Sequence, residues 1–147
     1  MTATTHALIG GVIAQYVPDP TIGISLSAIS HPIVDLIPHW DLGLGWKNKS
    51  KALLFYQAGA DFAIGVTLTF LIFGNTTNHL YLLICILISE SWDLLQMPYL
   101  LLNWKFLPFS AFYNFGHDTN HKAGMFWGVI SQIATIGVLV LTLRTIY

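Results

Sequence analysis

Histidine and carboxylate side chains are concentrated in one short stretch of an otherwise apolar chain. The stretch SHPIVDLIPHWD, residues 30–41, contains His31, Asp35, His39 and Asp41. Only 9% of the 147 residues are charged, so this concentration calls for a chemical explanation. Imidazole and carboxylate groups together form ligand sets that suit zinc, manganese or iron. The stretch therefore predicts one wall of a transition-metal site.

The spacing of these residues and of a second acidic pair supports this interpretation. His31 and Asp35 are four residues apart, so both project from one face of a helix. Glu90 and Asp93 are three residues apart and are likewise neighbours on a helix. A carboxylate that is not needed as a ligand can act as a general base, and these two are the candidates for that catalytic role.

Further candidate ligands lie outside these helical pairs. His117 and His121 form an H-x-x-x-H pair that would share one face if that stretch is helical. Pro38 cannot sit inside a continuing helix, so His39 and Asp41 are expected to fold back as loop ligands. His6, near the start of the chain, is a further candidate.

The composition indicates that these residues belong to a membrane protein. Hydrophobic residues make up 54% of the chain, and residues 62–89 and 123–143 contain no Asp, Glu, Lys or Arg. About 20 consecutive apolar residues suffice to cross a bilayer as a helix. The net charge of −1 argues against nucleic acid as a partner, because that would require a basic face.

The chain is expected to be a single all-α integral membrane domain covering residues 1–147, a polytopic helical bundle. Three segments are predicted to be clear spans, and the first two form an N-terminal helical hairpin in which Pro32 interrupts the second helix. The stretch 98–121 is expected to lie at the interface because prolines and a glycine break it. The five predicted helical segments are residues 5–16, 21–37, 51–73, 79–97 and 122–144.

The lysines predict the orientation of this bundle. They fall in two loops, at positions 47, 49, 51, 105 and 122, and the turn at residues 74–78 carries no charge. By the positive-inside rule these loops face the cytoplasm. On this threading five of the six histidines lie at the same face, and all five tryptophans lie on or near it. A metal site facing the cytoplasm, in a multi-pass inner-membrane protein, is therefore expected.

Three carboxylates within or beside the spans need partners. Asp61 lies about 15 Å along the third segment, and a charge at the centre of a membrane helix costs roughly 2.5–3.5 kcal/mol. No Lys or Arg lies within a span to pair with it or with the Glu90 and Asp93 pair. A divalent cation would stabilise all of them together with neutral imidazoles. The complete predicted ligand set is His6, His31, Asp35, His39, Asp41, Asp61, His117 and His121.

Each of these residues also has an ordinary structural interpretation. A histidine at a membrane boundary is commonly an interfacial residue, as we expect for His79. Asp118 could cap the last segment, and Asp41 could begin the turn DLGLG. The metal hypothesis depends on four separate segments bringing histidine or carboxylate to one depth.

Three short motifs together resemble the membrane-bound metal-dependent hydrolases, a family of small bacterial inner-membrane proteins. They are THALIGG near the start, DLIPHWD before a loop, and HDTNHKAG before the last segment. The resemblance implies that His6, Asp35, Asp41, His117 and His121 lie near a metal. The chain departs from the family pattern at Asp118, where an arginine is usual, which puts a phosphate-holding role for that position in doubt.

The predicted chemistry is hydrolysis at a metal centre, with zinc, manganese or iron as the cofactor and room for two ions. Two ions would suit phosphoester hydrolysis, because one activates water while both hold the displaced oxygens. The tryptophans and the aromatic stretch 99–115 predict membrane lipid as a partner, and a lipid or lipid-linked phosphoester as substrate. Two alternatives remain: a non-enzymatic protein that binds, senses or conducts a metal ion or proton, and a metal-free structural or partner-binding membrane protein.

Overall fold

The computed structural model describes residues 1–147 apart from the side chain of Trp46. The described residues form seven α-helices, a short 3-10 helix at Trp46–Asn48 and no strand, so the all-α prediction is confirmed. The helices are α1 (Ala3–Tyr16), α2 (Pro20–Asp35), α3 (Lys51–Phe73), α4 (His79–Ser89), α5 (Ser91–Leu102), α6 (Phe109–Thr119) and α7 (Met125–Ile146).

Four helices begin at a polar side chain that accepts hydrogen bonds from the exposed backbone N–H groups of the first turn. These N-cap residues are Thr2, Asp19, Ser50 and Asn78. Each is a residue type that favours this position, because its oxygen replaces a missing intrahelical acceptor. The starts of α1 to α4 are therefore encoded locally in the sequence.

Helix α2 continues through Pro32, which corrects the expected interruption there. Proline has no N–H group and leaves the carbonyl four residues earlier, that of Ala28, without its helical donor. The indole Nε1 of Trp92 in α5 donates to this carbonyl at 2.8 Å. The helix tolerates the proline because another helix supplies the missing hydrogen bond, and it ends at Asp35, before Pro38.

Two helices, α3 and α7, are long and apolar enough to cross a membrane, and α4 with α5 makes a third candidate if that bent pair is one span. The sequence predicted three clear spans. Among the described residues, only two single helices meet that description. Helices α4 and α5 are bent by 48° relative to each other around Glu90. The hydroxyls of Ser89 and Ser91 donate back to the carbonyls of Ile86 and Ile88, a pattern that bends helices.

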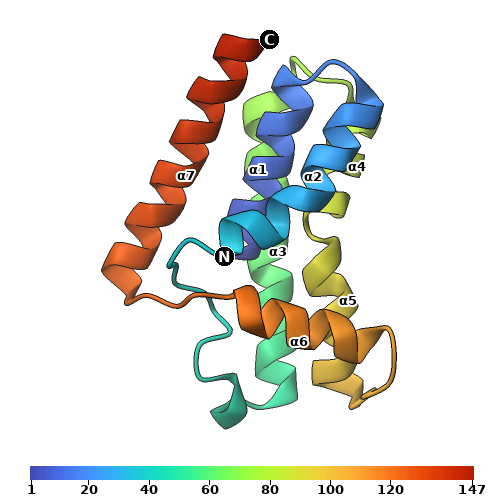
Figure 1. Cartoon of the computed structure of the whole chain (residues 1–147), viewed down its shortest axis with the longest axis vertical. Coiled ribbons are helices and arrows are strands. Elements are labelled where there is room, and N and C mark those ends of the chain that lie inside the picture. Colours follow the sequence, from blue (N-terminus) through green and yellow to red (C-terminus); the bar gives the residue numbers. More distant parts are fainter.

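Helix α1 lies at the centre of the bundle, with α2, α3, α4 and α7 packed around it (Figure 1). At 1.5 Å per residue its 14 residues extend about 21 Å, less than the roughly 30 Å of a bilayer core. Its side chains are nevertheless mostly buried, and they form the apolar core with neighbouring helices. The short helix is thus enclosed by protein, and its N-terminal end lies inside the bundle.

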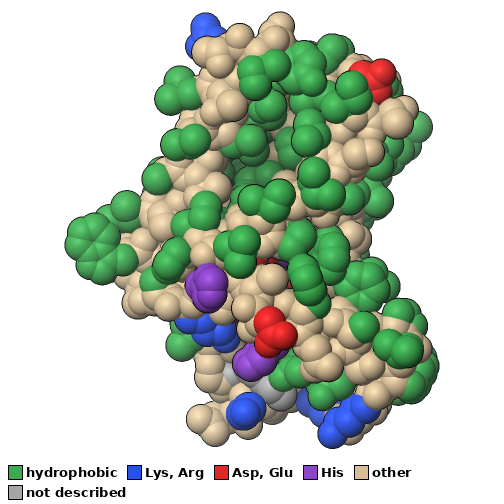
Figure 2. All heavy atoms as spheres, viewed as in Figure 1, with side chains coloured by type: hydrophobic (Ala, Val, Ile, Leu, Met, Phe, Trp, Pro, Cys, Tyr) green, Lys and Arg blue, Asp and Glu red, His purple; other side chains and the backbone are tan. Residues whose placement is uncertain are grey.

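Helix α6 was not predicted as a helix, because the stretch that contains it is interrupted by proline and glycine. It packs across α5 at the lower end of the molecule, where Tyr99 and Tyr113 stack with ring centroids 4.0 Å apart (Figure 1). Lysine side chains gather at this end, and apolar side chains are spread over the upper part of the visible face (Figure 2), while the one arginine, Arg144, lies in the last turn of α7. Trp104, Phe106 and Leu107 are exposed beside α6.

The crossing of α1 and α3 depends on Gly65. A Cβ atom at this position would lie 2.7 Å from the Cα of Thr4 and 3.0 Å from the Cβ of Ala7. We expect Gly65→Val to lower the free energy of unfolding by about 1–3 kcal/mol, because overpacking forces the two helices apart. Thermal unfolding in detergent, followed by circular dichroism, would measure the change.

Gly59→Val is the matched control on the same helix, because a Cβ atom there meets nothing within 4 Å. Equal destabilisation by both variants would show that helix propensity, and not the close approach of α1, accounts for the effect.

Candidate metal centre

The carboxylate of Asp35, the last residue of α2, is the point at which the histidines meet. Its Oδ1 lies 3.3 Å from His6 Nε2 and 3.8 Å from His39 Nε2, and its Oδ2 lies 3.3 Å from His31 Nε2. The amino group of Met1 also contacts Oδ1. Asp35 and these three imidazoles are almost completely buried. The sequence prediction that His31 and Asp35 share one helix face is confirmed by their contact.

His31 is held in an orientation suited to metal binding. Its Nδ1 donates to the carbonyl of Ser89 at 2.6 Å, so Nε2 is the nitrogen that faces Asp35 and Asp93, and in the neutral ring that a metal requires it would carry the lone pair. That carbonyl is the acceptor that residue 93 would use if α4 continued. The same contact therefore fixes the imidazole at the break between α4 and α5, where its Nε2 lies 3.6 Å from Asp93 Oδ1.

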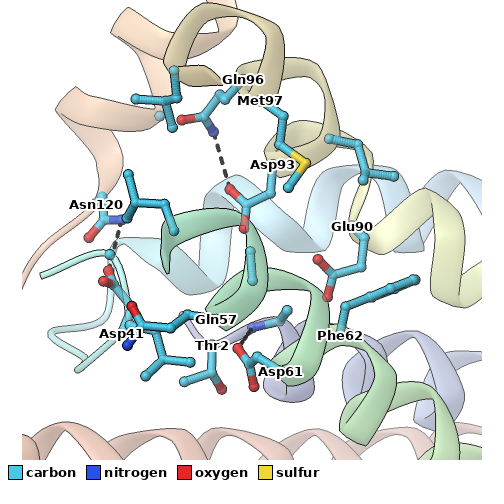
Figure 3. A pocket seen from close by; sticks show the side chains of 18 of the residues that line it. Thr2, Asp41, Gln57, Asp61, Phe62, Glu90, Asp93, Gln96, Met97 and Asn120 are labelled. Atoms are coloured by element: carbon cyan, nitrogen blue, oxygen red, sulfur yellow. Dashed lines mark hydrogen bonds between the residues drawn. The ribbon is translucent and has the colours of Figure 1, made fainter. Parts of the chain in front are cut away.

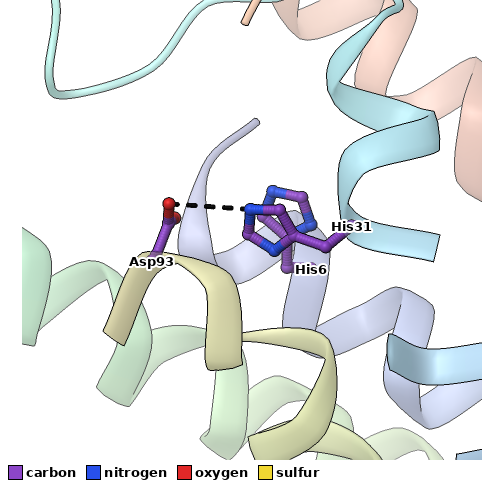
Figure 4. Close-up of side chains that lie close together, drawn as sticks. All are labelled: His6, His31 and Asp93. Atoms are coloured by element: carbon purple, nitrogen blue, oxygen red, sulfur yellow. Dashed lines mark ion pairs between the residues drawn. The ribbon is translucent and has the colours of Figure 1, made fainter. Parts of the chain in front are cut away.

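His6, His31 and Asp93 form a group of three potential ligands. One ligand atom of each lies within 4.8 Å of the others, and His31 Nε2 is 3.6 Å from Asp93 Oδ1 (Figure 4). The two imidazole rings are stacked with centroids 3.7 Å apart. Two donor atoms about 2.0–2.2 Å from one ion cannot be more than about 4.4 Å apart, so the His31–Asp93 spacing fits a shared ion.

Several buried atoms at this site have no hydrogen-bond partner. Leaving a buried polar group unsatisfied costs about 1–3 kcal/mol, so native structures normally avoid it. A cation would satisfy the free imidazole and carboxylate atoms together, since each has a lone pair. Among the described residues, the unpartnered atoms at the site are His6 Nδ1 and Nε2, His31 Nε2, His39 Nε2, Asp41 Oδ1, Glu90 Oε1 and Asn120 Oδ1.

His39 lies in the loop after α2, as expected from Pro38. Its Nδ1 donates to the carbonyl of Ile37 at 2.8 Å, and its Nε2 is 3.8 Å from Asp41 Oδ2. Burial lowers the pKa of His39 below its ordinary value of 6.5, so the ring is neutral at pH 7. A neutral imidazole with its hydrogen on Nδ1 offers Nε2 as a ligand, as at His31.

The loop before α7 is tied to the loop after α2 through the backbone. The N–H of His39 donates to the carbonyl of His121 at 2.9 Å, and the N–H of Ala123 donates to the carbonyl of His39 at 2.7 Å. The N–H of His121 donates to the carbonyl of Asp35 at 3.1 Å. These bonds bring two distant parts of the sequence together, as the predicted site required.

The side chains of the late histidine pair do not join the Asp35 group. The sequence predicted that His117 and His121 would share a helix face if their stretch were helical. Helix α6 ends at Thr119, so His121 lies outside it and the two do not share a face. The Nδ1 of His121 donates to the carbonyl of Leu36 at 2.8 Å, and the residue is exposed. His117 stacks on Tyr113 and lines the neighbouring cavity.

Asp61 has a structural partner of its own. Its Oδ2 accepts from the N–H of Ala3 at 2.7 Å, and its Oδ1 accepts from the hydroxyl of Thr4 at 2.7 Å and from the N–H of Thr4 at 3.3 Å. The carboxylate thus stabilises the start of α1, where the helix dipole is positive. The sequence predicted that Asp61 needs a partner, and in the structure these groups at the start of α1 are hydrogen-bonded to it.

A cavity of about 280 Å³ opens beside the ligand group (Figure 3). Carboxylates of Asp35, Asp41, Asp61, Glu90 and Asp93 line one part of it. Apolar side chains of α3 and α5 line another part, with Leu54, Phe55, Phe62, Leu94, Met97 and Leu100 among them. Glu90 sits at the break between α4 and α5 and is 3% exposed. The cavity therefore combines ion-binding chemistry with space for an apolar group.

Two polar residues that the sequence analysis did not select take part in the site. Asn120 Nδ2 donates to Asp41 Oδ2 at 3.4 Å, and its other amide atom has no partner. Gln132 Oε1 accepts from the N–H of Thr2 at 2.9 Å, and its Nε2 donates to the carbonyl of Trp40 at 3.0 Å. Gln132 is a buried amide in a predicted span, and that feature alone could have marked it.

No protein-family model, curated protein or solved structure matches this chain. Its function therefore has to be inferred from the geometry of the site.

Asp35 should be indispensable for metal binding. We expect purified protein incubated with zinc to hold about one equivalent or more, and Asp35→Asn to retain less than about a tenth of that, because the amide removes the charge that His6, His31 and His39 share. Elemental analysis after gel filtration in detergent would measure the content.

His79→Ala is the control, since His79 Nε2 donates to Gly74 at the opposite end of the bundle. Zinc retention by Asp35→Asn equal to that of the wild type, with both folded by circular dichroism, would contradict this assignment.

The position of the His39 loop depends on Gly128 of α7. A Cβ atom at Gly128 would lie 2.2 Å from the backbone nitrogen of Trp40. We expect Gly128→Ala to weaken zinc binding about tenfold or more, because it displaces His39, which contacts the Asp35 carboxylate that also contacts His6 and His31. Competition with a fluorescent zinc chelator would measure the affinity.

Gly137→Ala is the matched control on the same helix, because a Cβ atom there meets nothing within 4 Å. If Gly128→Ala and Gly137→Ala bind zinc equally, the contact between α7 and Trp40 does not position the ligands.

Proposed function

We propose that this protein is a membrane-embedded metal-dependent hydrolase that acts on a phosphoester attached to an apolar group. The observation that carries the proposal is the meeting of His6, His31, Asp35 and Asp93 beside a cavity with apolar walls. The resemblance of its sequence motifs to metal-dependent hydrolases agrees with this function.

The ligands of the ion are His6, His31 and Asp93, and a second carboxylate, that of Asp35, lies between the imidazoles. Three protein ligands leave a coordination position for water or substrate, which is the arrangement of catalytic zinc sites. Two imidazoles with carboxylates suit zinc, manganese or iron better than calcium or copper. The ion would supply Lewis-acid activation of water and of the phosphoryl oxygen. This assignment uses Asp93 as a ligand and leaves Glu90 for acid–base chemistry.

Glu90 is the general base. Its side chain reaches the cavity from the break between α4 and α5, and its Oε1 has no hydrogen-bond partner among the described groups. A carboxylate at this position would accept the proton of the attacking water and return it to the leaving alcohol. The balanced reaction breaks one P–O bond and forms another, so water and phosphoester give a phosphate and an alcohol.

The substrate is a lipid or a lipid-linked phosphoester. The apolar residues of α3 and α5 provide a wall for a hydrocarbon group, and Phe55 and Leu94 line the cavity while remaining 62% and 44% exposed. Trp104 and Phe106 are exposed near α6, and such aromatic residues favour the membrane interface. The lysines at the same end favour a cytoplasmic orientation in an inner membrane.

Substitution of Glu90 tests the catalytic part of this proposal. We expect Glu90→Gln to keep its zinc and to release phosphate from detergent-solubilised phosphatidic acid about 100-fold more slowly than the wild type, because the amide cannot accept a proton. Asp118→Asn, an exposed acidic residue of α6, is the control and should keep full activity.

Wild-type rates from Glu90→Gln would rule out Glu90 as the base. A zinc-loaded wild type that hydrolyses neither phosphatidic acid nor bis(p-nitrophenyl) phosphate would overturn the hydrolase function. A membrane protein that binds or senses an ion would then be the better explanation.

A further inference from the structure

We infer that a second divalent cation site, distinct from the His6–His31–Asp93 group, is formed by His39, Asp41 and Asn120. This inference extends the proposed function, which needs only one ion. Three observations support it: unpartnered donor atoms, the spacing of His39 and Asp41, and the access of Asp41 and Asn120 to the cavity.

The three side chains present donor atoms without partners. His39 Nε2, Asp41 Oδ1 and Asn120 Oδ1 are buried and accept no hydrogen bond among the described groups. His39 is completely buried and Asp41 is 8% exposed. A buried carboxylate is stable only with a compensating charge or with hydrogen bonds. Among the described groups, Asp41 Oδ2 lies 3.8 Å from His39 Nε2 and accepts a long 3.4 Å bond from Asn120 Nδ2, and its Oδ1 has no hydrogen-bond partner.

The spacing of these residues fits ligands of one ion. His39 Nε2 lies 3.8 Å from Asp41 Oδ2, within the limit of about 4.4 Å for two donors of one ion. The amide of Asn120 lies beside the same carboxylate, as Figure 3 shows from the cavity side. Backbone bonds between His39 and the 121–123 segment hold the two loops in this relation. The ligands are thus positioned before any ion binds.

The donor set differs from that of the first group and predicts a different ion. One imidazole, one carboxylate and one amide carbonyl form a harder, oxygen-rich set, which suits manganese or magnesium better than a set with two imidazoles. Asp35 lies between the two groups, because its Oδ1 is 3.8 Å from His39 Nε2 and its Oδ2 is 3.3 Å from His31 Nε2. The amino group of Met1 contacts the same Oδ1, so this carboxylate already attracts a positive group.

The second ion has a clear place in the proposed reaction. Asp41 and Asn120 line the cavity together with Glu90 and Asp93, so an ion held by the first pair would be in contact with a bound substrate. Two ions on either side of a phosphoryl group stabilise the attacking and the departing oxygen together. An anionic phosphate would otherwise approach a cavity lined by five carboxylates, which repel it.

The test is a manganese titration of zinc-loaded protein, followed by electron paramagnetic resonance of free Mn²⁺. We expect wild type to bind about one Mn²⁺ without losing zinc. Asn120→Leu should weaken Mn²⁺ binding about tenfold or more and leave the zinc content unchanged, because it removes a donor from the second site only. Asn114→Leu, an exposed position of α6, is the matched control and should bind both ions.

The outcomes separate this inference from the proposed function. Unchanged Mn²⁺ binding by Asn120→Leu, or Mn²⁺ that enters only by displacing zinc, would overturn the second site and leave the hydrolase proposal standing. Protein that holds no zinc but binds Mn²⁺ with dependence on Asn120 and Asp41→Asn would support the second site and contradict the proposed ligand group.

Discussion

The buried carboxylate of Asp35 is the constraint on which the rest of the structure depends. Removing an ion from water costs several kcal/mol unless its partners are well placed, and here these are the amino group of Met1 and three imidazoles. These partners come from the start of α1, from α2 and from the loop after it. The first two helices must therefore pack so that the beginning of one meets the end of the other. The backbone of Asp35 adds a further tie, because its carbonyl accepts from His121.

The functional groups are gathered where helices end or break. In three histidines, His31, His39 and His121, Nδ1 donates to a backbone carbonyl, of Ser89, Ile37 and Leu36 respectively. Carbonyls near helix ends lack intrahelical donors, so they are available to orient a side chain. Each of these hydrogen bonds gives a backbone carbonyl a donor and also places a hydrogen on Nδ1 of the imidazole. The same irregular backbone would be costly facing lipid, and the contact of His31 with Ser89 is buried inside the protein.

Much of the fold could be predicted from local sequence signals, but the site could be predicted only in part. Helix α3 has the predicted bounds, because Ser50 caps it and an uninterrupted apolar run follows. The contact of His31 with Asp35 follows directly from helical periodicity. The break at Glu90 could be predicted only in part, because the hydroxyls of Ser89 and Ser91 are a local signal, whereas the hydrogen bond from His31 to the carbonyl of Ser89 joins residues 58 positions apart. The partners of Asp61 in α1 and the approach of Asn120 to Asp41 are likewise tertiary contacts, which no local pattern reports.

The bond between Trp92 and the carbonyl of Ala28 fixes how α2 and α5 are aligned along their lengths. A shift by one residue would leave the carbonyl of Ala28 without a donor and the half-buried indole of Trp92 without an acceptor, so both helices resist sliding. Trp92 is adjacent to Asp93, and Pro32 is adjacent to His31. Pro32 and Trp92 therefore fix the alignment of α2 and α5 at positions next to His31 and Asp93. A substitution in this pair would change the distance between two candidate metal ligands, His31 and Asp93, although neither substituted residue belongs to that group.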